Sequence, residues 1–113
     1  METAIIMTHA DEYPRWTQRT TLSGVLYELY FNWIERTGTW TMSVLDASGT
    51  LLLGGIRLVP GIDLLAKYRV SVGGLPAGKL IVIDRQNDPV TAELDRNSFG
   101  ERFLLGYFDF GGQ

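Results

Sequence analysis

The side chains that could do chemistry in this chain are one histidine, several aspartates and a few serines. A metal site around His9 would have to recruit carboxylates as its other ligands, because the chain has no cysteine and hence no thiolate. No acidic residue stands at a ligand-like spacing from His9. Its place at the end of an apolar run indicates an ordinary polar strand end, and we expect no metal and no cofactor.

The aspartates raise a second possibility, because paired carboxylates can hydrolyse glycosides. Each of them stands at a predicted turn or strand end, where aspartate is favoured for its hydrogen bonds to nearby backbone: Asp46, Asp63, Asp84, Asp88 and Asp95. A hydrolase also needs a cleft, for which a compact chain of 113 residues leaves little room. A small hydrolase is therefore an alternative that would require an activity abolished by one aspartate substitution.

Nucleophiles and phosphate cradles are not indicated either. No serine has the G-x-S-x-G context of a nucleophile elbow. The glycine pairs at 54–55, 73–74 and 111–112 precede no predicted helix, so they lack the geometry of a phosphate-binding loop. The sequence predicts no catalytic residue, and we expect that the protein is not an enzyme.

Length and charge narrow the classes of protein to which the chain could belong. At 113 residues we expect a single domain, 1–113, with residues 1–12 as an N-terminal arm. The net charge of −3, without a basic cluster, argues against a nucleic-acid ligand. No apolar run approaches the ~20 residues that span a bilayer, and the start "METAIIMTHADE" lacks the basic region of a signal peptide. We expect a soluble protein without a membrane anchor.

Period-two alternation dominates the chain and predicts an all-β fold. Alternating runs at 25–34 and 40–45 flank a short loop with Gly38, which is typical of a β-hairpin. Further strands are expected at "TAIIMTHA", "RWTQRTTL", "TLLLGGIRLVP", Tyr68 to Val72, "KLIVID" and Arg102 to Phe110. About seven or eight short antiparallel strands indicate a small β-sandwich or a partly open barrel. The polar stretch from 85 to 100 is expected to be a surface loop.

The stretch "LVPGIDLLAKY" (58–68) interrupts this pattern. Pro60 and Gly61 suit the two central positions of a type II turn, the second of which needs positive φ. Asp63 is placed to cap a short helical turn by accepting backbone N–H bonds. Leu64 and Leu65 can then close one end of the sandwich, so residues 60–67 are expected to form a turn or helical plug.

The aromatic residues exceed what one small core can bury, so some are expected at the surface. Trp16, beside Pro14 and Arg15, and the neighbouring Tyr13 are our candidates to point outward and anchor a protein interface. The alternative is a carbohydrate-binding β-sandwich, in which exposed aromatic rings stack on sugars. The alternation instead places most of the aromatics on faces suited to the core: Tyr27, Phe31, Trp33 and Trp40.

The order of motifs resembles the baseplate plug proteins of contractile phage tails, of the cyanophage type. The matching pieces are "YELYFNWIERTGTWTMSVLDASGTLLLGGIRLVPGIDLLAKY", "LPAGKLIVID", "NDPVTAELDR" and "RFLLGYF", which together cover most of residues 15–108. The resemblance implies that a structural signature lies at Pro60, Gly61, Asp63, Leu64, Leu65 and Tyr68. It also implies a later turn marked by Asp84, Asp88 and Pro89.

The resemblance further implies a non-enzymatic structural protein of the virion, assembled in the host cytoplasm and placed in the tail baseplate. Partners would be the hub, tail tube or sheath-initiator proteins, and several copies would assemble symmetrically. The candidate interface residues are Tyr13, Trp16, Asp88 and Pro89. We expect the termini and the loop 84–98 to make the contacts between subunits.

Overall fold

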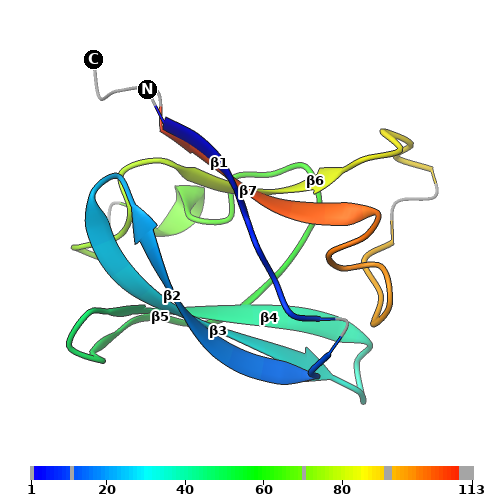
Figure 1. Cartoon of the computed structure of the whole chain (residues 1–113), viewed down its shortest axis with the longest axis horizontal. Coiled ribbons are helices and arrows are strands. Elements are labelled where there is room, and N and C mark those ends of the chain that lie inside the picture. Colours follow the sequence, from blue (N-terminus) through cyan, green and yellow to red (C-terminus); the bar gives the residue numbers. More distant parts are fainter. Residues whose placement is uncertain (1, 11, 70, 91–92, 110–113) are drawn as a thin grey trace.

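Two antiparallel β-sheets lie face to face in the computed structural model (Figure 1), which describes residues 2–10, 12–69, 71–90 and 93–109. Within those ranges, one sheet has three strands in the order β1-β7-β6 and the other has four in the order β2-β3-β4-β5. The strands are β1 (Glu2–Ile6), β2 (Arg15–Leu22), β3 (Val25–Ile34), β4 (Thr39–Asp46), β5 (Leu51–Arg57), β6 (Lys79–Asp84) and β7 (Phe103–Asp109).

The four-stranded sheet is a meander built by local turns. Ser23 and Gly24 both have positive φ (53° and 79°), so a two-residue turn joins β2 to β3. The predicted hairpin of β3 and β4 is confirmed, with Gly38 at φ 65° in its loop. The next turn is held by Asp46, whose Oδ1 accepts N–H bonds from Ser48 and Thr50 at 2.9 Å each.

The glycine pair of β5 coincides with an irregularity in the sheet. The register between β4 and β5 shifts around Val44, and Gly55 has φ 61°. The Gly55 N–H donates to the Ser43 hydroxyl at 2.8 Å rather than to a ladder carbonyl. A bulge at this position bends β5 and directs the chain after it toward the other sheet.

The segment after β5 runs along the free side of β6. Gly61 N–H donates to the Val82 carbonyl at 2.9 Å, and Leu64 N–H donates to the Leu80 carbonyl at 2.8 Å. Gly61 has φ 85°, as the predicted turn requires. This segment thus covers the edge of the three-stranded sheet with hydrogen bonds that an open edge would leave unmade.

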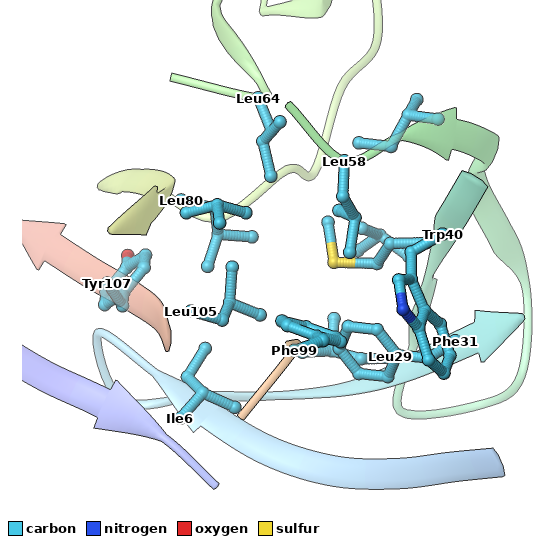
Figure 2. Packing of buried hydrophobic residues seen from close by; sticks show 14 of the residues in the cluster. Ile6, Leu29, Phe31, Trp40, Leu58, Leu64, Leu80, Phe99, Leu105 and Tyr107 are labelled. Atoms are coloured by element: carbon cyan, nitrogen blue, oxygen red, sulfur yellow. The ribbon is translucent and has the colours of Figure 1, made fainter. Parts of the chain in front are cut away.

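The core lies between the sheets and is dominated by large apolar side chains (Figure 2). Phe31, Trp40 and Tyr107 are fully buried, and Leu65 reaches the same interior from the 58–68 segment. Phe99, from the loop before β7, packs against Phe31 and Trp40 with ring centroids 5.9 and 5.4 Å away. Burial of Leu64 and Leu65 is as the sequence predicts.

The structure confirms an all-β sandwich without closure into a barrel and corrects two local predictions. The described residues of the predicted strand 68–72, which exclude residue 70, do not form a strand. Tyr68 ends a 3-10 helix (η1, Ala66–Tyr68), and the Val72 N–H donates to the Tyr68 carbonyl at 2.9 Å. The helical turn, which the Asp63 cap led us to expect over residues 64–66, lies at Ala66–Tyr68 instead. Asp63 still accepts the Leu65 N–H at 3.1 Å, ahead of that helix. No helix within the described ranges is long and apolar enough to cross a membrane.

Candidate interaction surface

The two sheets present very different outer faces to solvent. On the four-stranded sheet, one cross-strand row is Arg15, Asn32, Thr41 and Arg57, and the next begins Thr17, Tyr30 and Ser43. Arg19 and Glu28 are paired at 3.4 Å in the row beyond. Apolar side chains lie at the two ends of this face, with Leu26, Leu45 and Leu51 at one end and Ile34 at the other. This face has the polar character expected of a solvated sheet.

The outer face of the three-stranded sheet is apolar instead. Its cross-strand rows follow from the register: Gly106 lies between Ile5 and Ile81, while Leu104 lies beside Ile83. We call this surface the apolar face and define it as Thr3, Ile5, Met7, Lys79, Ile81, Ile83, Leu104, Gly106 and Phe108. Only Thr3 and Lys79 among these carry a polar side-chain group.

Exposure on the apolar face is greatest along β1. Ile5 is 49% exposed and Met7 76%, while Leu104 and Phe108 are half-buried. Gly106 lies at the centre of the apolar face, where the neighbouring side chains leave no room for a side chain of its own. A Cβ at that position would lie 2.7 Å from Ile83 Cδ1 and 2.8 Å from the Phe108 ring. The neighbouring side chains lean over the glycine and make a continuous apolar surface.

Shallow hollows flank the apolar face on both sides. One, of about 290 Å³, lies between Ile5, Met7 and Leu104, with Glu101 on its rim. The other, of about 370 Å³, lies beside β6 and joins two motifs that are distant in sequence, since its lining includes Pro60, Gly61, Ile81, Ile83, Asp84, Asp88 and Pro89. The structure thus brings part of the 60–68 signature against the 84–89 turn.

Asp84 holds together the turn that lines the hollow beside β6. Its carboxylate accepts two bonds from the Arg102 guanidinium, at 2.8 Å (Nε to Oδ1) and 3.0 Å (Nη2 to Oδ2). It also accepts the backbone N–H groups of Gln86 and Asp88 at 3.0 Å each. These bonds, the Arg102 pair first, hold the pKa of Asp84 well below its ordinary value of 3.8. Arg102 also donates to the Asp88 carbonyl, which fixes the turn.

The predicted interface residues fall into two separate places. Asp88 and Pro89 lie at the rim of the apolar face, whereas Tyr13 lies in the turn before β2 and Trp16 lies at the start of β2. The expectation that Trp16 points outward is wrong. Its indole is half-buried and stacks on Phe31 at 4.8 Å, because the register places these two residues opposite each other. Tyr13 is 51% exposed.

The arrangement of the tryptophans also bears on the carbohydrate-binding alternative. Trp16 and Trp33 both pack against Trp40, at 5.7 and 5.5 Å between ring centroids, and Trp40 is fully buried. They form a cluster against the core rather than a platform along an exposed face. No observation therefore favours the sugar-binding alternative.

Metal and acid–base chemistry find no support in the described ranges. No group of three or more His, Asp or Glu side chains there could hold a metal ion. His9 lies 5.9 Å from the Trp16 ring, edge to face, and its Nδ1 is 3.7 Å from Glu12. The five aspartates considered above as candidates serve backbone turns or ion pairs, as Asp46, Asp63 and Asp84 illustrate.

The apolar face was not singled out from the sequence, although a signal for it is present. "KLIVID" and "RFLLGYF" are apolar at consecutive positions, which indicates strands covered on both sides. Here one side is covered by the core and the other is open. Exposed apolar surfaces of this kind are typical of interaction sites.

The fold and the surface define the class of protein as a small all-β sandwich with a packed core and one exposed apolar face. Comparison with protein families makes the assignment more specific. The chain belongs to the family described as cyanophage baseplate Pam3 plug gp18, whose model matches residues 4–110. No curated protein matches the chain. Membership of this family implies a non-enzymatic structural role in the virion baseplate and association with other baseplate proteins.

Proposed function

We propose that this protein is a plug that clamps neighbouring baseplate components together through its apolar face. The neighbours are hub, tail tube or sheath-initiator proteins, and several copies are arrayed about the tail axis. Each interface is then of moderate strength, and the array is strong because many copies engage at once. The protein is assembled in the host cytoplasm and functions in the virion.

The observation that carries this proposal is the contrast between the two outer faces of one molecule. A sheet that faces water alternates apolar and polar residues, as the four-stranded sheet largely does. The three-stranded sheet places Ile5, Ile81 and Leu104 on its solvent side instead. Burying such a surface against a partner is favourable by roughly 25 cal/mol per Å² of apolar area.

The surroundings of the apolar face resemble the rim of a protein interface. Lys79 lies at one end, and Glu101 and Asp88 lie in the flanking hollows at the other. An apolar centre with a charged rim is typical of interfaces between separately folded proteins. Rim charges that meet water also make such an interface easier to release than a wholly apolar one, which suits a clamp that must let go when the tail contracts.

The proposal is tested by co-expressing the chain with the tail proteins encoded beside it, followed by size-exclusion chromatography with light scattering. The unmodified chain should elute in a stoichiometric complex with at least one of them. An Ile5→Asp/Met7→Asp variant should leave the complex, because two buried carboxylates oppose the contact. A Thr17→Asp/Thr21→Asp variant, which places the same charges on the other edge strand β2, should remain bound.

Two results would overturn the proposal. One is a chain that elutes alone in the presence of every tail protein. The other is a complex that tolerates the Ile5→Asp/Met7→Asp variant but is lost with the Thr17→Asp/Thr21→Asp variant, which would place the interface on the four-stranded sheet.

A further inference from the structure

A third hollow lies away from the apolar face, between the end of β5 and the 3-10 helix. Its volume is about 480 Å³, and its lining is mostly apolar: Ile56, Arg57, Val59, Ile62, Asp63, Leu64, Ala66, Lys67 and Tyr68. We call it the basic hollow. Ile62 is 53% exposed and Val59 37%, so two aliphatic side chains of the 58–68 segment are left facing water there.

The charges around the basic hollow are unbalanced. Asp63 is neutralised by Arg69, whose Nη2 lies 3.0 Å from its Oδ2. Within the described residues, Arg57 and Lys67 are exposed and have no carboxylate partner, and the Lys67 Nζ lies 5.4 Å from the centre of the Tyr68 ring. The hollow therefore carries a net positive charge in a chain whose total is −3. An apolar floor with a basic rim fits an apolar or aromatic side chain flanked by carboxylates.

The same chain carries a protrusion of that chemistry. Tyr13 is 51% exposed, and Glu12 beside it is exposed as well. The N–H groups of both residues donate to the His9 carbonyl at 3.0 Å, so a hydrogen-bonded turn presents the two side chains. The Glu12 carboxylate lies 3.7 Å from His9 Nδ1. The turn, dark blue at the lower right, lies apart from the yellow-green 3-10 helix on the left (Figure 1).

We propose that the basic hollow receives the Glu12–Tyr13 turn of a second copy of this chain. The tyrosine ring would cover Val59 and Ile62, and Glu12 would meet Lys67 or Arg57. Because the two surfaces differ and lie apart on one molecule, the contact is head to tail, and such contacts generate rings when the rotation closes. The inference rests on the proposed function in one respect only, that several copies act side by side.

The test is sedimentation velocity of the full-length chain alone at increasing concentration, at low and at high salt. The unmodified chain should associate, and salt should weaken the association because rim charges contribute to it. Lys67→Glu should weaken it roughly tenfold or more, since like charges then face each other. Arg36→Glu makes the same charge change in the exposed β3–β4 loop and should have no effect. Tyr13→Ser should weaken association without altering the net charge.

A mixing experiment separates a direct contact from a general charge effect. Glu12→Lys and Lys67→Glu should each sediment as weakly associating species. An equimolar mixture of the two should associate again, because the basic turn of one variant meets the carboxylate that replaces Lys67 in the other. Circular dichroism checks that each variant is folded.

Several outcomes would overturn the inference. These are a chain that stays monomeric at all concentrations, association that is unchanged in Lys67→Glu, and a mixture that fails to recover. Binding of a baseplate neighbour that is lost with Lys67→Glu while self-association persists would assign the hollow to that neighbour instead. The proposed function fails on a different readout, the complex with tail proteins, so the two failures are distinguishable.

Discussion

At the scale of single residues, the sequence predicts that the aspartates stabilise turns, but it does not predict which residues they bind. Asp84 is the last residue of β6, and its carboxylate accepts four hydrogen bonds. Two of them come from Arg102, which is 18 residues away along the chain. Both side chains are largely withdrawn from water, at 12% and 17% exposure. This pair fixes the turn at one rim of the apolar face.

The Asp84–Arg102 pair should make stability depend on acid. Because the fold lowers the pKa of Asp84 below 3.8, its stabilisation is complete above that value and is lost as the pH falls through the folded pKa. Asp84→Asn should therefore be less stable than the unmodified chain at pH 7, and the difference should shrink below about pH 4. Urea unfolding across this pH range measures it. Exposed Glu93→Gln is the control, and an equal pH profile for Asp84→Asn and the unmodified chain would contradict the account.

At the scale of elements, the 58–68 segment is both part of the fold and part of two surfaces. Its backbone pairs with β6 through Gly61 and Leu64, and its leucines enter the core. Between those inward positions, Val59 and Ile62 face outward. Arg69 then ties the segment to the next loop, donating to the carbonyls of Pro76 and Gly78 as well as to Asp63.

Gly78, where that loop enters β6, should tolerate no side chain. A Cβ there would lie 2.6 Å from the Phe108 carbonyl oxygen and 2.7 Å from the Tyr107 ring, and the Gly78 N–H donates to the Tyr107 hydroxyl at 2.8 Å. Gly78→Ala should lower the free energy of unfolding by roughly 1–3 kcal/mol through overpacking.

The matched control is Gly73→Ala in the same loop, where a Cβ would meet nothing within 4 Å. Its effect should stay within about 0.5 kcal/mol. Both values come from urea denaturation. Equal stability of the two variants would contradict the close packing of Gly78 against β7.

The elements that could be predicted from sequence are those set by local patterns. The β3–β4 hairpin follows from alternation and a glycine loop, and the Pro60–Gly61 turn follows from backbone preference. The pairing of β1 with β7, which places Glu2 opposite Asp109, cannot be predicted from any local sequence pattern. Trp16 was misplaced for the same reason, because its neighbours in sequence are polar while its neighbour in register is Phe31.

The candidate interaction surface could be predicted only in part from local sequence patterns. Asp88 and Pro89 were predicted as interface residues and do lie at the rim of the apolar face, whereas Tyr13 lies elsewhere. An apolar face needs three strands side by side, and strand order cannot be derived from alternation alone. Runs such as "KLIVID" indicate only that both sides of a strand are covered, not by what.

At the scale of the whole molecule, two outer faces of opposite character suggest a direction of assembly. The four-stranded sheet turns a largely polar face to solvent, and the three-stranded sheet exposes the apolar face, which we propose is covered by a baseplate neighbour. Family membership places the protein among baseplate plugs. The central claim is that the apolar face, not the polar one, is covered in the assembled tail.

The most direct test uses the absence of cysteine from the chain, which makes single-cysteine labelling clean. Ile5→Cys and Thr17→Cys place one thiol on each outer face, both at exposed positions. Each variant is treated with a maleimide, once as the isolated protein and once in assembled tails, and labelling is measured by mass spectrometry. The account predicts that the Ile5→Cys thiol reacts in the free chain and is protected on assembly, while the Thr17→Cys thiol reacts in both. Equal reactivity at Ile5→Cys in both states, or protection of Thr17→Cys alone, would contradict it.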